Sequence, residues 1–141
     1  YAAAYSIATI GIFGLLAKMN DYTFDGFNGF AKKQPAIAAT MVVFLLSLAG
    51  IPLTAGFLSK FYMLRATINS GNIWLAIFAV LMAAVSVYYY FRLIQAMYFK
   101  DGNGGGSMQL SSSFKYTMIG LAGITILLGV FPNLLINWLY F

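Results

Sequence analysis

The sequence predicts an all-α integral membrane protein, and three observations lead to this prediction. Of the 141 residues, 62% are hydrophobic and only 8% are charged, and the mean hydropathy is +0.84. Apolar stretches of roughly 20 residues recur between short polar breaks, which is the length that an α-helix needs to cross about 30 Å of hydrocarbon. The strand-like alternation that is typical of a membrane β-barrel is absent.

Four transmembrane spans follow one another in a single membrane domain, residues 1–141. They cover about residues 1–17, 35–69, 73–99 and 114–140, and two loops at about 18–34 and 100–113 separate them on one side. Most basic residues lie in or beside these loops: Lys18, Lys32, Lys33, Arg92, Lys100 and Lys115. The positive-inside rule therefore places both loops in the cytoplasm and both chain ends on the outer side.

The second span is too long for one straight crossing, and Gly50-Ile51-Pro52 interrupts it. Proline removes a backbone donor and clashes with the preceding turn, while glycine weakens the helix beside it, so we expect two half-helices. Unwound backbone at membrane depth is tolerated only where it packs in protein or faces a polar cavity. The plain alternative is a proline kink that only shapes the packing.

Lys60 is the most informative residue of this span. It lies nine residues before Asn69, about 13 Å from the outer surface and near the bilayer centre. A charge there is costly and indicates function. The only acidic residues, Asp21, Asp25 and Asp101, fall in the predicted loops, so we expect Lys60 to pair outside the chain or to titrate. Desolvation penalises the charged form of a lysine, so a buried lysine in a polar channel can load and release a proton.

A structural role for Lys60 stays open, in which it caps the unwound carbonyls at residues 50–53. Several hydroxyl groups are candidates to line a cavity near it: Tyr5, Ser6 and Thr9 in the first span, then Thr54, Ser59 and Ser86. Hydroxyls at such sites more often bond helix carbonyls than carry protons, so Thr54 and Ser59 are only weak candidates.

Other chemistry is excluded by composition. The chain has no Cys and no His, so it lacks the ligands for a thiolate or imidazole metal site, a haem or an iron–sulfur cluster, and it cannot form a disulfide. The run at 101–107 lacks the Lys-Ser/Thr ending of a P-loop and is interpreted as a flexible turn. The net charge of +5 forms no basic stripe, so we expect no nucleic-acid partner. The chain starts inside a hydrophobic span without a signal peptide, so we expect a fragment of a longer protein.

The strings LLSLAGIPLTAGFLSKFYML and VSVYYYFRLIQAMY resemble the carboxy-terminal part of the N subunits of bacterial NADH:quinone oxidoreductase, complex I, the counterparts of mitochondrial NADH dehydrogenase subunit 2. The resemblance covers residues 1–99 well and the last span only by position and hydrophobicity. The related M subunit has an acid at the position of Lys60, and the L subunit lacks the YYYxR pattern. The resemblance implies that the four spans are helices eleven to fourteen of a fourteen-helix antiporter-like fold with two inverted repeats.

The resemblance also implies roles for individual residues. Lys60 matches a helix-twelve lysine that ends a buried proton path toward the outer side, and Gly50 and Pro52 match the helix break. The YYYxR motif matches Tyr88, Tyr89, Tyr90 and Arg92. For this motif we favour an aromatic belt and a snorkelling arginine over a proton relay, and its four residues remain candidates for channel lining.

The implied function is that of a non-redox, proton-translocating subunit of respiratory NADH:quinone oxidoreductase in the bacterial inner membrane. It would couple quinone reduction to outward proton pumping through Lys60, beside sister antiporter-like subunits. The resemblance implies no cofactor or metal in this chain, and places NADH, FMN, iron–sulfur clusters and quinone on other subunits.

Three alternatives remain. The first is a subunit of a multisubunit sodium/proton antiporter, which the YYYxR string argues against. The second is a small four-helix drug exporter, which would need a membrane-embedded glutamate. The third is a structural assembly subunit, which would leave Lys60 unexplained.

Overall fold

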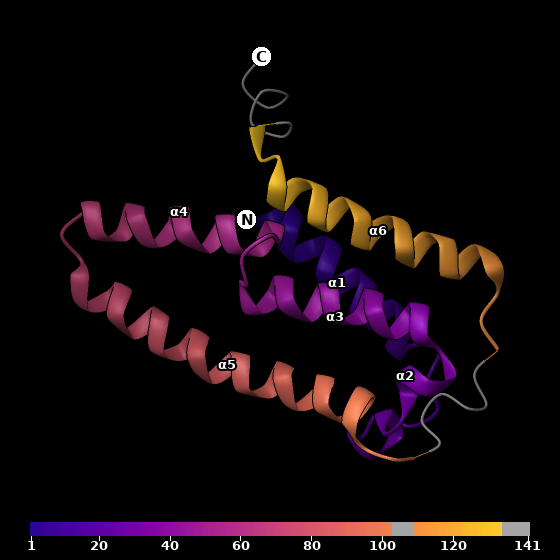
Figure 1. Cartoon of the computed structure of the whole chain (residues 1–141). Coiled ribbons are helices and arrows are strands. Elements are labelled where there is room, and N and C mark those ends of the chain that lie inside the picture. Colours follow the sequence, from indigo (N-terminus) through magenta and orange to yellow (C-terminus); the bar gives the residue numbers. More distant parts are fainter. Residues whose placement is uncertain (103–108, 134–141) are drawn as a thin grey trace.

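The computed structural model describes residues 1–102 and 109–133, and this part of the chain is helical without strands. The all-α prediction is thus confirmed. In chain order the helices are α1 (Ala2–Leu16), η1 (Asp25–Phe27), α2 (Phe30–Lys33), α3 (Pro35–Ala49), α4 (Ala55–Asn69), α5 (Ile73–Phe99) and α6 (Ser112–Val130). Figure 1 shows α1, α3 and α6 lying side by side, with α4 and α5 forming a long hairpin.

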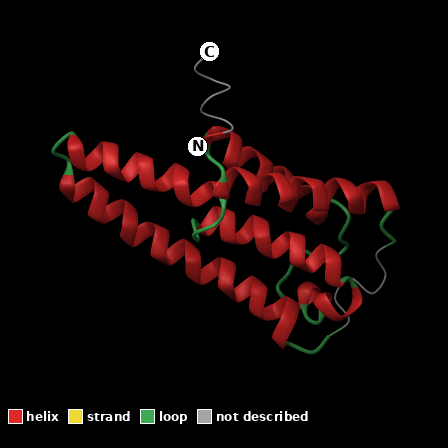
Figure 2. Cartoon of the chain, turned by 45° about the horizontal axis from the view of Figure 1, so that its top comes forward, coloured by secondary structure: helices red, strands yellow, loops and turns green. Residues whose placement is uncertain are grey.

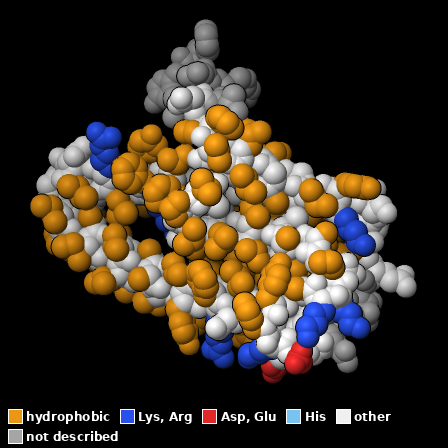
Figure 3. Space-filling view, in the orientation of Figure 1, with side chains coloured by type: hydrophobic (Ala, Val, Ile, Leu, Met, Phe, Trp, Pro, Cys, Tyr) orange, Lys and Arg blue, Asp and Glu red, His pale blue; other side chains and the backbone are white. Residues whose placement is uncertain are grey.

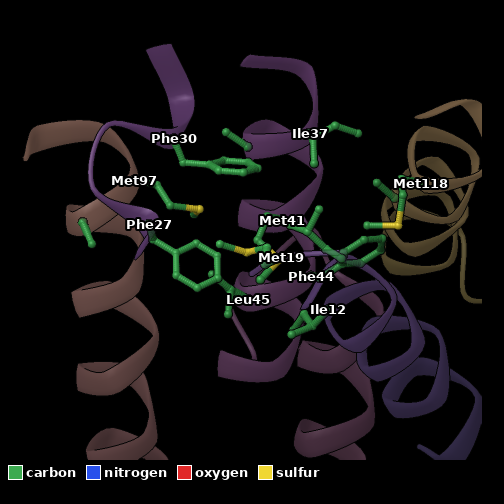
Figure 4. Close-up of a cluster of buried hydrophobic side chains, with 14 of the residues drawn as sticks. Ile12, Met19, Phe27, Phe30, Ile37, Met41, Phe44, Leu45, Met97 and Met118 are labelled. Atoms are coloured by element: carbon green, nitrogen blue, oxygen red, sulfur yellow. The ribbon is translucent and has the colours of Figure 1, made fainter. Parts of the chain in front are cut away.

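Helix α3 is at the centre of the packing and contacts α1, α2, α4, α5 and α6. Its side chains Met41 and Phe44 are completely buried, in a cluster that draws on α1, α2, α5 and α6 (Figure 4). Gly11 of α1 permits this packing, because a β-carbon there would lie 2.6 Å from Cζ of Phe44. Shape complementarity between α1 and α3 therefore depends on a residue without a side chain.

The α4–α5 hairpin extends away from the other helices, as Figures 1 and 2 show from two directions. Among the 27 residues of α5, only Ala76, Ala96 and Met97 are buried. Large apolar side chains cover the outside of the hairpin (Figure 3). Such a continuous apolar surface is typical of contact with lipid or with another protein.

Two of the described helices, α5 and α6, are long and apolar enough to cross a membrane. Helices α1 and α3 are apolar but have 15 residues each, about 22 Å of helix, which is shorter than a hydrocarbon core. The second predicted span is two helices, α3 and α4, separated by residues 50–54.

Two other predicted segments can be compared with the helices of the structure. The fourth span is predicted over about 114–140, and α6 covers Ser112–Val130 of it; residues 134–140 lie outside the described part, so that end stays a prediction. Phe131 leaves the helix with φ −120° and ψ 68°, because the residue before a proline, here Pro132, is sterically kept out of the helical region. The loop at 18–34 is not featureless, since η1 and α2 form within it.

This loop is attached to the end of α5. The Gly29 amide donates to the Ala96 carbonyl at 3.2 Å, and Lys32 Nζ forms an ion pair with Asp101 at 2.5 Å. The hydrogen bond and the charge of Lys32 hold the pKa of the Asp101 carboxyl below its ordinary value. Charged side chains gather at this end of the molecule in Figure 3, so the two ends of the helices differ in polarity.

Candidate functional site

The site is built on the break between α3 and α4. Helix α3 ends at Gly50, whose φ of 81° and ψ of 41° lie in the left-handed region that glycine adopts without strain. The Gly50 amide donates to the Ser47 carbonyl at 3.1 Å, and the Ile51 amide donates to Leu46 at 3.0 Å. These two bonds form a Schellman motif, which satisfies two of the four carbonyls that a helix end leaves free.

Lys60 of α4 satisfies the other two carbonyls. Its Nζ donates to the carbonyl oxygens of Leu48 at 2.7 Å and Ala49 at 3.2 Å. A cation is favourable there, because a helix carries partial negative charge at its carboxyl end. The ammonium has a third N–H, for which the described part of the chain offers no hydrogen-bond partner.

The prediction that the chain itself offers Lys60 no good partner is therefore wrong. It rested on the absence of carboxylates within the spans, whereas the acceptors are main-chain carbonyls. These carbonyls belong to the last turn of α3, just before the 50–53 segment considered for a capping lysine.

The start of α4 is held against the same turn of α3. The Gly56 amide donates to the Ser47 hydroxyl oxygen at 3.2 Å, and a β-carbon on Gly56 would overlap the Ser47 carbonyl. The link between the helices includes Leu53 with a positive φ of 75°, and Thr54 Oγ1 donates to the Ile51 carbonyl at 2.7 Å. This close approach sets Lys60, one turn further along α4, beside the end of α3.

A pocket of about 190 Å³ opens beside Lys60, where α1, α3, α4 and α5 meet. Its lining residues are Tyr1, Ala4, Tyr5, Ser47, Leu48, Gly56, Ser59, Lys60, Ser86 and Tyr90. The hydroxyls of Ser59 and Ser86 donate to carbonyls of their own helices, Ala55 at 2.8 Å and Met82 at 3.1 Å. Their oxygens can still accept hydrogen bonds. The pocket thus combines one ammonium with several hydroxyl oxygens, and is large enough to hold water.

The structure brings only some of the candidate residues together. Lys60, Ser59 and Tyr90 share the pocket, and Ser86 and Tyr5 join them. Gly50 and Pro52 lie in the break, and Thr54 is buried there without lining the pocket.

The rest of the YYYxR motif lies elsewhere. Tyr88 and Arg92 line a separate pocket toward the other end of α5. Tyr89 is exposed, and its ring packs edge-on against that of Tyr88 with 5.5 Å between the centroids. The motif is therefore divided between two faces of α5.

Sequence reasoning missed Ser47 and Tyr1. The available signal for Ser47 was a lone hydroxyl in an apolar stretch, three residues before a glycine that could end a helix. Tyr1 gave no comparable signal.

The described residues contain no group of three or more His, Cys, Asp or Glu side chains that could hold a metal ion. The pocket and the break provide an ammonium, several hydroxyls and the main-chain carbonyls at the end of α3.

A broken helix that meets a lysine at a polar pocket resembles the arrangement in transporter-like membrane proteins, in which irregular backbone lines a cavity. The comparison with known families gives a more specific assignment. The chain belongs to the NADH:quinone oxidoreductase/Mrp antiporter transmembrane family, whose pattern matches residues 1–86.

Relatives agree with this assignment. The chain is 41% identical over 134 residues to NADH-quinone oxidoreductase subunit N of Bdellovibrio bacteriovorus, covering 92% of this chain and 28% of the relative. It is 36% identical over 137 residues to subunit N of Desulfitobacterium hafniense, covering 94% of this chain and 28% of the relative. The resemblance to N subunits is thus confirmed, and the chain spans only about a quarter of these relatives.

A solved structure shows the same fold. A chain of respiratory complex I from Thermus thermophilus with bound aureothin superposes with a TM-score of 0.84 and 23% sequence identity. The match covers 95% of this chain and 32% of that one. The helix arrangement of this chain therefore matches that of part of a complex I chain.

Proposed function

We propose that this chain contributes to a proton-translocating, non-redox membrane subunit of a respiratory NADH:quinone oxidoreductase. Redox energy from subunits that carry NADH, FMN, iron–sulfur clusters and quinone would shift protonation along buried charges, and Lys60 would pass protons outward. Sister antiporter-like subunits and the lipid of a bacterial inner membrane would surround the chain.

One observation supports this proposal most: the lysine that caps the helix break also borders a polar pocket joining four helices. A protonated Lys60 binds the carbonyls of Leu48 and Ala49. A neutral amine would still donate, but it would lose its charge attraction to the helix end and would expose a lone pair to the pocket. The protonation of Lys60 and the strength of its binding to the end of α3 would therefore be coupled.

We further propose that the chain makes four crossings, with α1 as the first, α3 and α4 together as the second, and α5 and α6 as the third and fourth. The 15-residue helices α3 and α4 add up to about 45 Å of helix, enough for one tilted crossing with an unwound joint. The basic end of the molecule would face the cytoplasm and both chain ends the outer side.

Replacing Lys60 by arginine tests the relay. The guanidinium can donate to the Leu48 and Ala49 carbonyls, so the cap survives, but it stays protonated at any working pH and cannot release a proton. We expect Lys60→Arg complexes to assemble in normal amounts and to lose most of their proton uptake per NADH oxidised in reconstituted vesicles.

Lys60→Met removes both the cap and the relay, so it should lower assembly as well as pumping per assembled complex. Thr67→Ala is the matched control, because its hydroxyl donates only within α4, to the Met63 carbonyl, and it does not line the pocket. Normal pumping by assembled Lys60→Arg and Lys60→Met complexes would overturn the relay and leave Lys60 as a structural cap.

The family description also includes Mrp antiporters, so a sodium/proton antiporter subunit is the second candidate. The relatives described above are N subunits, which favours the first. Sodium-dependent proton exchange by the isolated membrane assembly, without NADH oxidation, would support the antiporter.

A further inference from the structure

We infer that the pocket at the loop end of α5 binds the phosphate headgroup of an anionic phospholipid. This pocket, of about 510 Å³, is lined by Tyr88, Phe91, Arg92, Gln95 and Lys100 and shares no residue with the pocket at Lys60. The inference rests on the membrane placement proposed above and is independent of proton transfer.

Among the described residues, the cations of this pocket have no ion-pair partner. The pocket is lined by two cations and no carboxylate. Asp101, the acid beside Lys100, is engaged by Lys32 at 2.5 Å, which is the only ion pair of the described residues. Neither Arg92 nor Lys100 has a hydrogen-bonded acceptor in the described ranges. A phosphate would supply the missing acceptor, and it fits the fork of an arginine with two parallel bonds.

The arginine is held in place for such a contact. Its guanidinium carbon lies 4.7 Å from the centroid of the Phe24 ring, which comes from the loop at 18–34. This cation–π contact covers one face of the guanidinium and leaves its N–H groups free at the edge. Tyr88, Arg92 and Gln95 follow one another at four and three residues, so they lie on one stripe of α5. A hydroxyl, a guanidinium and an amide thus offer donors to one side.

The position suits a lipid headgroup better than a free phosphate. This end of α5 carries several exposed aromatic side chains, as is common at membrane interfaces: Tyr88, Tyr89, Phe91, Tyr98 and Phe99. Charged groups of the loops lie at the same end (Figure 3). From Tyr88 back toward the start of α5, exposed apolar residues such as Val85 and Phe78 provide a path for acyl chains. The cationic pocket would thus bind the polar headgroup, and the apolar residues of α5 would contact the acyl chains.

Cross-linking by a photoactivatable phosphatidylglycerol tests the inference. The assembled complex would be reconstituted in phosphatidylcholine nanodiscs with this probe, and labelling of the peptide at 88–100 would be measured by mass spectrometry. We expect Arg92→Gln and Lys100→Gln each to reduce labelling at limiting probe about fivefold. Arg65→Gln is the matched control, because Arg65 is an exposed arginine near the far end of α4.

Equal labelling of all variants, or an equal drop in Arg65→Gln, would overturn the proposed site. Equal labelling by a photoactivatable phosphatidylcholine would show that the pocket does not select anionic headgroups. Displacement of the probe by inorganic phosphate would indicate a free-phosphate site instead. Lys100→Gln keeps the test valid if Arg92→Gln disturbs the loop, because Lys100 is exposed at the end of α5.

Discussion

At the scale of single residues, Lys60 can reach the end of α3 because residue 50 has no side chain. A β-carbon on Gly50 would lie 2.8 Å from Lys60 Cδ and 3.6 Å from Nζ. The left-handed backbone of Gly50 and the lysine cap thus both depend on the absence of a β-carbon at residue 50. The Schellman bonds and the ammonium then account for all four terminal carbonyls of α3.

Gly50→Ala tests this dependence against Gly71→Ala. Both glycines have φ 81°, but a β-carbon added to Gly71 would meet no atom within 4 Å. Both substitutions should cost about 1–2 kcal/mol for the left-handed backbone. Gly50→Ala should cost about 1.5 kcal/mol more, because it displaces an ammonium from its hydrogen bonds. Thermal denaturation of the assembled complex would measure the difference. Equal melting temperatures for the two variants would contradict the claim that a β-carbon at residue 50 and the Lys60 side chain compete for the same space.

At the scale of helices, the packing of α1 on α3 depends on Gly11. The ring of Phe44, which is completely buried, fills the space that a side chain at Gly11 would need. Gly14, three residues further along α1, has open space around it. The face of α1 that carries Gly11 therefore packs tightly against α3, whereas the position of Gly14 does not.

We expect Gly11→Ala to destabilise the chain by about 1–3 kcal/mol, because it overpacks a buried contact. Gly14→Ala should be neutral or stabilise α1 by up to about 1 kcal/mol, since alanine has the higher helix propensity. Denaturation of the assembled complex, monitored by limited proteolysis, would compare the stability of the two variants. Similar behaviour of the two variants would show that α1 can move away from α3 at little cost.

At the scale of the whole molecule, the apolar surface of the α4–α5 hairpin needs an apolar environment. Val85, at the middle of α5, is 50% exposed, whereas Tyr22 is 67% exposed in the charged loop region. If α5 crosses the bilayer, Val85→Lys should cost about 3 kcal/mol and reduce the membrane-inserted, assembled chain. Tyr22→Lys should leave assembly intact, and immunoblots of the membrane fraction would quantify both. Normal insertion and assembly of Val85→Lys would indicate that this face of α5 meets water.

Much of the helix arrangement was predictable because it has local causes. The breaks at Gly50-Pro52 and at 70–72 follow from residues that weaken or end helices next to them. Helix α6 ends at Val130 because Pro132 keeps Phe131 out of the helical region, whereas the predicted end of the fourth span near 140 lies outside the described residues and stays a prediction. The short helices at 25–27 and 30–33 were not predicted, since they are stabilised by packing on α3 and α5 rather than by their own length.

The sequence by itself determined that the chain is helical and apolar, where its helices break, and which end carries the charge. Only the tertiary structure decided what Lys60 binds and which side chains share its pocket. The ammonium is 11 and 12 residues away from its acceptors, and these acceptors are carbonyls, which every residue has. No side-chain pattern marks such groups. They become available only where a helix ends and another packs against it, and that is a property of the fold.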